Sequence, residues 1–201
     1  MCGRFHLEPD EDFYPRFGLK HKDDDYPLQP NHNIKPGQII PTIIHQDKNN
    51  KLTGMKWGFV PVWAKDPKIG YKMINSRSET IFEKPSFRLA IRKTRCLIPA
   101  TGFYEWDEKK NANLFQIKGK KYFAMAGIYS EWKDPQGEIL TTCSIITREA
   151  NKDARDVHER MPVILDEESE NEWLSNDDLG YLEHVLNKPT DKSLSSRIVT
   201  L

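Results

Sequence analysis

The sequence predicts an α+β fold: a single domain over residues 1–201 in which an antiparallel β-sheet curls into a barrel-like shape, with several helices at its periphery. A chain of 201 residues is long enough for one domain with a complete hydrophobic core. Most periodic segments are short, rich in β-branched and aromatic residues, and bounded by Gly, Pro, Asn or Asp. Helical patterns are fewer and fall mainly in the second half, which favours α+β over an alternating α/β architecture.

Ten segments have the composition and alternation of strands. They are residues 3–7, 38–45, 52–60, 96–100, 102–106, 114–118, 122–129, 139–147, 162–165 and 197–200. The connections at residues 47–50, 119–121 and 134–137 carry the turn-forming residues of β-hairpins.

Helices are predicted in four places. They are a broken stretch over residues 78–83 and 85–93, a segment over 149–155, and two late helices over 166–174 and 177–186. Each of the two late segments opens with acidic residues, which interact favourably with the positive end of a helix dipole.

Charge and composition exclude several classes of protein. The chain has five Trp, seven Tyr and nine Phe, which argues against disorder, and it has no apolar run near the roughly 20 residues of a membrane span and no signal peptide. We therefore expect a soluble, intracellular protein. Thirty basic and thirty acidic residues give a net charge of zero, so global charge gives no support to nucleic-acid binding. The run from 84 to 95 is nevertheless purely basic in its charges, and it predicts either a basic groove or a solvated helix face.

The three cysteines are Cys2, Cys96 and Cys143, an odd number without a C-x-x-C pair. This pattern predicts neither a disulfide framework nor a metal site. Cys96 and Cys143 lie in apolar strand-like segments and are expected to be buried core residues. Cys2 has no such surroundings to explain it.

Removal of Met1 would give Cys2 an α-amine beside its thiol. The amine condenses with an aldehyde to an imine, and the tethered thiol then closes a thiazolidine ring. Ordinary pKa values of about 7.7–8.0 for the amine and about 8.5 for the thiol leave both groups partly deprotonated near neutrality. The alternatives are acyl transfer by Cys2 as an N-terminal nucleophile, or a chance cysteine behind a retained Met1.

Five blocks of sequence resemble the SRAP family, the SOS response-associated peptidases. They are MCGRF at residues 1–5, WGFVPVWA at 57–64, NSRSET at 75–80, RCLIPATGFYEW at 95–106 and HERMP at 158–162, with a weaker block, TREAN, at 147–151. Ser76 and Val62 stand where the family often has Ala and Ser, and neither change removes a titratable group.

The resemblance implies an SRAP-type fold and recognition of abasic sites in single-stranded DNA, without a cofactor. It further implies a covalent thiazolidine DNA–protein cross-link through Cys2, together with a β-lyase activity. In this reading the peptidase of the family name describes self-processing that removes Met1.

Three residues join Cys2 as the predicted catalytic group. Glu105 is a carboxylate on a largely apolar strand, where burial would suit it to acid–base catalysis, and the resemblance makes it a catalytic residue. His158 would assist proton transfer at the imine stage or abstract the sugar proton in β-elimination. Asn75 would orient the sugar oxygen or the Cys2 amine, although Asn-Ser is also a common capping sequence.

Contacts to DNA are predicted for basic and aromatic residues in the same blocks. Guanidinium groups suit phosphate contacts, and tryptophans suit stacking on exposed bases, with salt bridges to neighbouring acids as the competing explanation for the arginines. The predicted DNA-binding residues are Arg4, Arg77, Arg160, Trp63, Trp106 and Thr147. Trp57 is expected in the core.

Two further functions remain open from the residues. The chain would be a cysteine-nucleophile peptidase if Cys2, His158 and Glu105 acted as a triad on peptides. It would be a non-catalytic reader of modified DNA if binding survived the loss of Cys2 and Glu105. The expected partner is single-stranded DNA with abasic sites, bound by a monomer, with no membrane and no defined replication partner.

Overall fold

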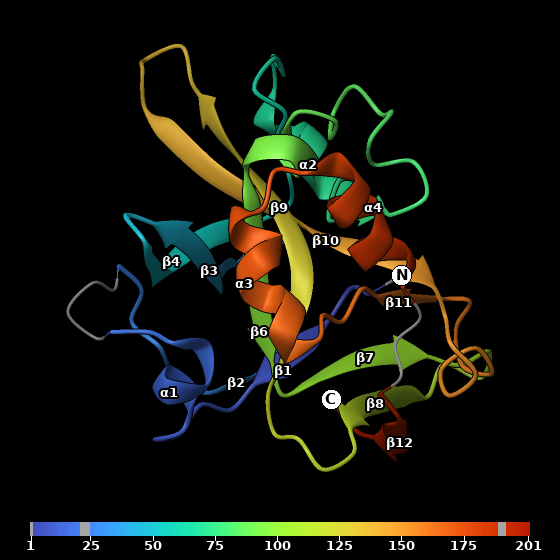
Figure 1. Cartoon of the computed structure of the whole chain (residues 1–201). Helices are drawn as coiled ribbons and strands as arrows, with labels where there is room; N and C mark the ends of the chain where they lie inside the picture. Colours follow the sequence, from blue (N-terminus) through green and yellow to red (C-terminus); the bar gives the residue numbers. More distant parts are fainter. Residues whose placement is uncertain (1, 21–24, 189–191) are drawn as a thin grey trace.

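The computed structural model describes residues 2–20, 25–188 and 192–201, and it builds the chain around two β-sheets (Figure 1). Five strands of the larger sheet close into a barrel, because β10 pairs with both β4 and β9. In order around the barrel they are β10 (Ile139–Glu149), β4 (Asn49–Trp57), β3 (Ile39–Gln46), β6 (Arg95–Ala100) and β9 (Phe123–Lys133). All these pairings are antiparallel except that of β10 with β4.

Two short strands extend the barrel at the carboxyl end of β10. They are β5 (Asn75–Arg77), parallel to β10, and β11 (Arg160–Pro162), antiparallel to it. Thr147 pairs with Arg77 in one of them and with Pro162 in the other, so the two strands flank β10 at the same level.

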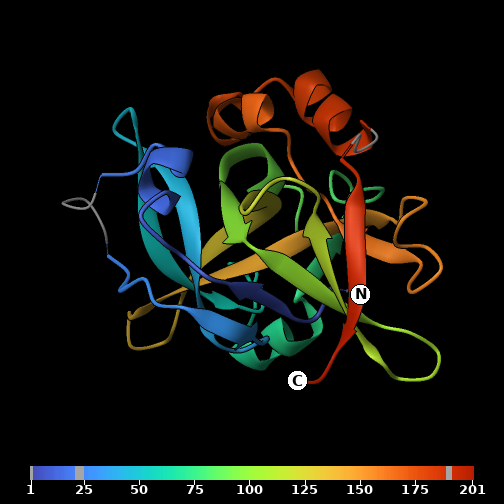
Figure 2. The ribbon, with the colours of Figure 1, turned by 90° about the horizontal axis from the view of Figure 1, so that it is seen from below.

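The second sheet is antiparallel and carries the amino-terminal segment (Figure 2). In spatial order its strands are β12 (Leu194–Val199), β8 (Ala112–Ile117), β7 (Gly102–Trp106), β1 (Phe5–Leu7) and β2 (Asn31–Ile34). Strand β1 therefore lies between β7 and β2, and its pairing with β7 places the residues that precede it beside the end of β7.

Helices are short and lie outside the barrel (Figure 1). They are α1 (Phe13–Phe17), the 3-10 helix η2 (Pro67–Lys72), α2 (Ala90–Lys93), α3 (Glu167–Ser175) and α4 (Leu179–Asn187). Buried Arg95 holds the end of α3, since its guanidinium donates to the carbonyls of Trp173 at 2.7 Å and Asn176 at 2.9 Å. Among the described helices, none is long and apolar enough to span a membrane.

The structure confirms the predicted fold class and most of the predicted strands. The fold class is the predicted α+β with a curled, largely antiparallel sheet, and nine of the ten predicted strands overlap an observed strand that covers most of their length. The tenth, 162–165, overlaps β11 only at Pro162. Trp57, Cys96 and Cys143 are buried in the core, as expected.

Several local predictions were wrong, each because tertiary pairing decided the structure. The turn at 119–121 joins β8 to β9, which lie in different sheets and form no hairpin. Residues 149–155 form turns after β10 in place of a helix, and most of 78–93 forms turns, with α-helix only at Ala90–Lys93. Strands β2 and β5 and helix α1 had no prediction, because each is too short to show a period.

Candidate active site

The pairing of β1 with β7 brings Cys2 to Glu105. Phe5 pairs with Phe103, and the Tyr104 amide donates to the Arg4 carbonyl at 2.9 Å. The same antiparallel register places the residues before Arg4 beside Glu105. Cys2 and Glu105 are 0% and 3% exposed, so this end of the strand pair buries a thiol and a carboxyl together.

Burial shifts the acidity of both groups upward. Desolvation, and secondarily the negative charge of Glu105, raise the pKa of the Cys2 thiol far above its ordinary value. Desolvation also raises the pKa of Glu105 to about 7. Burial therefore opposes deprotonation of the thiol, and the carboxyl is the group that is partly ionised at neutral pH. The partial deprotonation expected for Cys2 once Met1 is removed stays a prediction.

Asn75 contacts Cys2 directly. Its Nδ2 donates to the carbonyl of Cys2 at 3.0 Å and to that of Ile74 at 3.1 Å. The side-chain Oδ1 is buried and accepts no hydrogen bond from the residues that the structure describes. Asn75 thus holds the backbone of Cys2 and keeps an acceptor oxygen available inside the site.

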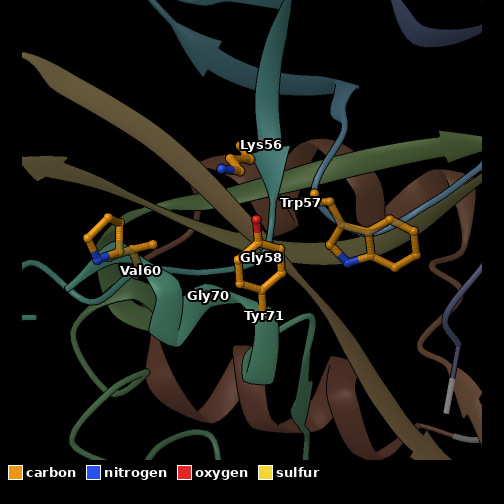
Figure 3. Close-up of a pocket in the computed structure, with 8 residues that line it drawn as sticks. Lys56, Trp57, Gly58, Val60, Gly70 and Tyr71 are labelled. Atoms are coloured by element: carbon orange, nitrogen blue, oxygen red, sulfur yellow. The ribbon is translucent and has the colours of Figure 1, made fainter.

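Trp57 and Asn75 donate hydrogen bonds to the same backbone carbonyl. The Trp57 indole Nε1 donates to the Ile74 carbonyl at 2.8 Å, the same oxygen that Asn75 contacts. Figure 3 shows Trp57 beside Gly58, with Gly70 and Tyr71 of the following segment lying against them. The small pocket there has a volume of about 10 Å³, which leaves space for about one water molecule and no ligand.

The loop between Gly58 and Gly70 is held by a close backbone approach. A Cβ on Gly70 would lie 2.5 Å from the carbonyl oxygen of Gly58, and Gly58 itself has a φ of +138°. Both positions therefore require glycine. This contact fixes the path of the chain that leads from Trp57 into Asn75.

His158 lies on the other side of β10, next to β11. The Arg160 amide donates to its Nδ1 at 2.9 Å, so a neutral ring carries its proton on Nε2. Burial lowers the pKa of His158, which keeps the imidazole neutral at physiological pH. The sheet topology brings His158 and Asn75 to the same end of β10.

Arg160 is a partner of Glu79. Its guanidinium donates to the two carboxylate oxygens at 2.5 and 2.9 Å and to the Thr147 carbonyl at 2.8 Å, and the side chain is 11% exposed. The competing salt-bridge explanation thus holds in the DNA-free protein. Glu79, 81 residues away in sequence, was missed, although it lies within the NSRSET block.

Thr147 itself is 1% exposed, with its hydroxyl 3.5 Å from the Ser76 carbonyl oxygen. Its side chain faces the interior between β5 and β11. A direct contact between this side chain and DNA would require it to become exposed, and this contact stays a prediction.

The other predicted DNA-binding residues lie at the surface. The Arg4 guanidinium stacks 5.1 Å from the ring centroid of half-buried Trp106, and Arg77 is exposed. A cleft of about 390 Å³ next to His158 is lined by Arg77, Glu79, Arg160 and their neighbours. Trp63 is 57% exposed and lines a different groove, so the described surface separates it from these residues.

Comparisons with known proteins identify the family of this chain. The family model described as "SOS response associated peptidase (SRAP)" matches residues 1–200. Abasic site processing protein YoqW of Bacillus subtilis is 46% identical over 193 residues, covering 92% of this chain and 86% of that protein. Abasic site processing protein HMCES of Mus musculus is 34% identical over 187 residues, covering 72% of this chain and 53% of its own length.

Solved structures share the fold. A protein from Bacteroides thetaiotaomicron is 32% identical, with a TM-score of 0.77 over 84% of this chain and 78% of its own. A protein from Bordetella bronchiseptica is 23% identical, with a TM-score of 0.84 over all of both chains, which shows a common fold.

Proposed function

Because this chain belongs to the SOS response associated peptidase family, we propose that it captures abasic sites in single-stranded DNA as a covalent cross-link to Cys2. The proposal rests on one observation above all. The Cys2 thiol is buried together with the Glu105 carboxyl, whose pKa is about 7, and the Asn75 side chain donates a hydrogen bond to the Cys2 carbonyl. The relatives' names as abasic site processing proteins support it.

The first step forms an imine after Met1, which lies outside the described residues, has been removed. Glu105 in its protonated form donates a proton to the ring oxygen of the abasic sugar, the C1′ hydroxyl releases its proton to solvent, and the ring opens to the C1′ aldehyde. The Cys2 amine attacks that carbon and water leaves, giving the C=N bond. The Asn75 Oδ1 accepts from the amine and orients it.

The second step closes the ring. The thiol remains protonated because burial raises its pKa, so the sulfur needs a base at the moment of attack. Glu105, left ionised by the first step, accepts the thiol proton, the S–C bond forms as the C=N π bond breaks, and the nitrogen takes up a proton from solvent. A group with a pKa near 7 is suited to donate in one step and accept in the next.

His158 has a separate role as a hydrogen-bond donor. Because its Nδ1 accepts from the Arg160 amide, the neutral ring presents an Nε2–H, which can donate a hydrogen bond to the carbinolamine hydroxyl as that group leaves as water. Abstraction of the sugar proton in β-elimination would require the ring first to release Nδ1 from the Arg160 amide. The DNA strand is held by Arg4, Arg77 and Trp106, which are at least partly accessible around the site.

The raised pKa of the Cys2 thiol disfavours the peptidase alternative on unrelated substrates. A cysteine hydrolase attacks as a thiolate, which requires a depressed thiol pKa. Here burial and the neighbouring carboxylate act in the opposite direction. In the imine mechanism the amine attacks first, so a neutral thiol is no obstacle.

A denaturing gel tests the proposal. Processed protein is incubated with single-stranded DNA from which one uracil has been excised, and a shifted band that survives heat and detergent is expected. Cys2→Ala should abolish this band, whereas borohydride should restore it, because the α-amine of the variant still forms an imine that reduction traps. Blocking Met1 removal should abolish both bands.

Two matched controls make the result specific. Cys96→Ala removes a buried thiol on β6, a strand that pairs with β3 and β9 and not with the strands that carry the site, and it should retain the cross-link. DNA that carries intact uracil should give no band with any variant. A stable band with Cys2→Ala in the absence of borohydride would overturn the proposal.

A further inference from the structure

A second surface of the molecule is an open apolar groove with a volume of about 280 Å³. Its walls come from loop 59–63, from the segment 85–94 and from the end of β9. Val62, Trp63 and Leu89, which line it, are 61%, 57% and 62% exposed. Three large exposed apolar side chains around one groove are more typical of a binding surface than of an ordinary surface. We call this surface the Trp63 groove.

The loop that carries Trp63 is firmly anchored. The Val60 amide donates to Thr142 Oγ1 at 2.8 Å, and the Trp132 indole donates to the Ala64 carbonyl at 2.7 Å. The Ser130 hydroxyl donates to the Val60 carbonyl. These bonds on both sides of Trp63 hold its backbone, so the apolar exposure is a property of the fold.

One wall of the Trp63 groove is part of the basic run singled out in the sequence. Lys84, Arg88 and Lys93 are exposed, and none of them forms an ion pair within the part of the chain that the structure describes. The lining itself holds one cation, Lys93, and one carboxylate, Glu131, and the positive charge in excess comes from Lys84 and Arg88, each adjacent in sequence to a lining residue. An occupant with negative charge beside an apolar group is therefore complementary to this surface.

The lining favours a peptide over a nucleic acid. Apart from Trp63, half-buried Tyr129 and the charged Lys93 and Glu131, the exposed walls are the aliphatic and proline side chains of Val62, Leu89 and Pro85. Single-strand binders offer successive aromatic faces for base stacking. A groove with one exposed ring and aliphatic walls suits an aliphatic or aromatic anchor of a peptide.

We propose that the Trp63 groove binds a partner protein through a short acidic segment, with an aliphatic or aromatic anchor between Trp63 and Leu89 and its carboxylates toward Arg88 and Lys93. The groove borders β10 near Thr142, three to five residues before the residues that flank the active site, which is about 10–17 Å along a strand. A partner would thus bind while the active site holds DNA. This inference does not rest on the chemistry of Cys2.

Selection of peptides on the full-length chain tests the proposal. Random twelve-residue peptides displayed on phage are selected on the immobilised protein, with counter-selection on a Trp63→Ala/Leu89→Ala variant. The expected consensus has an aliphatic or aromatic residue flanked by at least two acidic residues. The leading peptide, labelled with fluorescein, should lose at least tenfold in affinity with Leu89→Ala and with Arg88→Glu/Lys93→Glu.

The control variant is Ile198→Ala, which removes another exposed apolar side chain, 66% exposed on β12, and should leave peptide affinity unchanged. Circular dichroism confirms that each variant is folded. The proposal is overturned if no peptide depends on Trp63 and Leu89, or if the selected peptides lack acidic residues. It is also overturned if labelled dT12 binds, loses affinity in the same variants and displaces the peptide, since the groove would then be a DNA site.

Discussion

Strand β10 supports two surfaces of opposite chemistry. At residues 145–149 it is flanked by the strands that carry Asn75 and Arg160, where ionisable groups are buried. At Thr142 it anchors the loop of the Trp63 groove, where apolar groups are exposed. Desolvation at the first surface changes proton affinities and so supplies reactivity, while exposure at the second leaves surface for a partner to cover.

The largest expected effect is on cross-linking at the candidate active site, where Glu105 is buried. Glu105→Gln removes the group that donates and accepts protons, and single-turnover cross-linking to abasic DNA should slow by about 100-fold or more. The wild-type rate should also show a limb near pH 7 that the variant lacks. Glu138→Gln, on the exposed β9–β10 hairpin, is the matched control and should react at the wild-type rate. Equal rates for Glu105→Gln and wild type would remove Glu105 from the mechanism.

The second effect is on stability as a function of pH. The folded pKa of Glu105, about 7, lies above the ordinary value of 4.5, so folding favours the protonated form. Wild type therefore loses stability as pH rises from 4.5 to 7, by about 3 kcal/mol in total. Glu105→Gln should lack this loss. Urea titrations of both proteins at pH 5 and pH 8 measure it, and parallel pH dependence in the two proteins would contradict the shifted pKa.

The third effect joins the two surfaces, because the segment from Gly58 to Gly70 leads from Trp57 through the Trp63 groove. Gly70→Ala places a Cβ 2.5 Å from a backbone oxygen, so the backbone must move, and stability should fall by about 2 kcal/mol. Gly119→Ala, with a φ of +75° and no atom within 4 Å of its Cβ, isolates the cost of conformation alone and should cost about 1 kcal/mol. Equal losses in the two variants would show that the close approach is unimportant.

The smallest expected effect concerns Arg160. Lysine cannot reproduce its two-pronged contact with Glu79 or reach the Thr147 carbonyl in the same geometry, so Arg160→Lys should cost about 1 kcal/mol. The cross-linking rate should stay near that of wild type, because lysine keeps the backbone amide that donates to Nδ1 of His158. Arg155→Lys, on an exposed turn, should leave both quantities unchanged. If Arg160→Lys were as stable as wild type, the contacts of the Arg160 guanidinium with Glu79 and Thr147 would not contribute to stability.

The strands were largely predictable because half-buried strands show a two-residue period in the sequence. Closure of the barrel was predicted only as curvature, because the pairing of β10 with both β4 and β9 is a long-range choice. Strand β5 has only three residues, and its Asn-Ser start is also typical of a helix cap. Local chemistry cannot show which strands a short segment will join.

In the site, the identities of Cys2, Asn75 and Glu105 came from the motifs, and the structure brings these three together. Their protonation states depend on burial, which no local pattern reveals. For this reason the motifs assign the thiol its ordinary pKa, whereas burial raises it. The pairing of Arg160 with Glu79 was equally hidden, since it joins residues on separate strands and turns.

Mass spectrometry of the cross-linked product tests the central claim most directly. The account predicts a species whose mass is that of the chain without Met1 plus the abasic oligonucleotide, less one water, because imine formation releases water and ring closure releases nothing. Fragmentation should place the DNA remnant on Cys2, without a reducing agent. A stable product that retains Met1, or that carries the DNA on a lysine, would contradict the account.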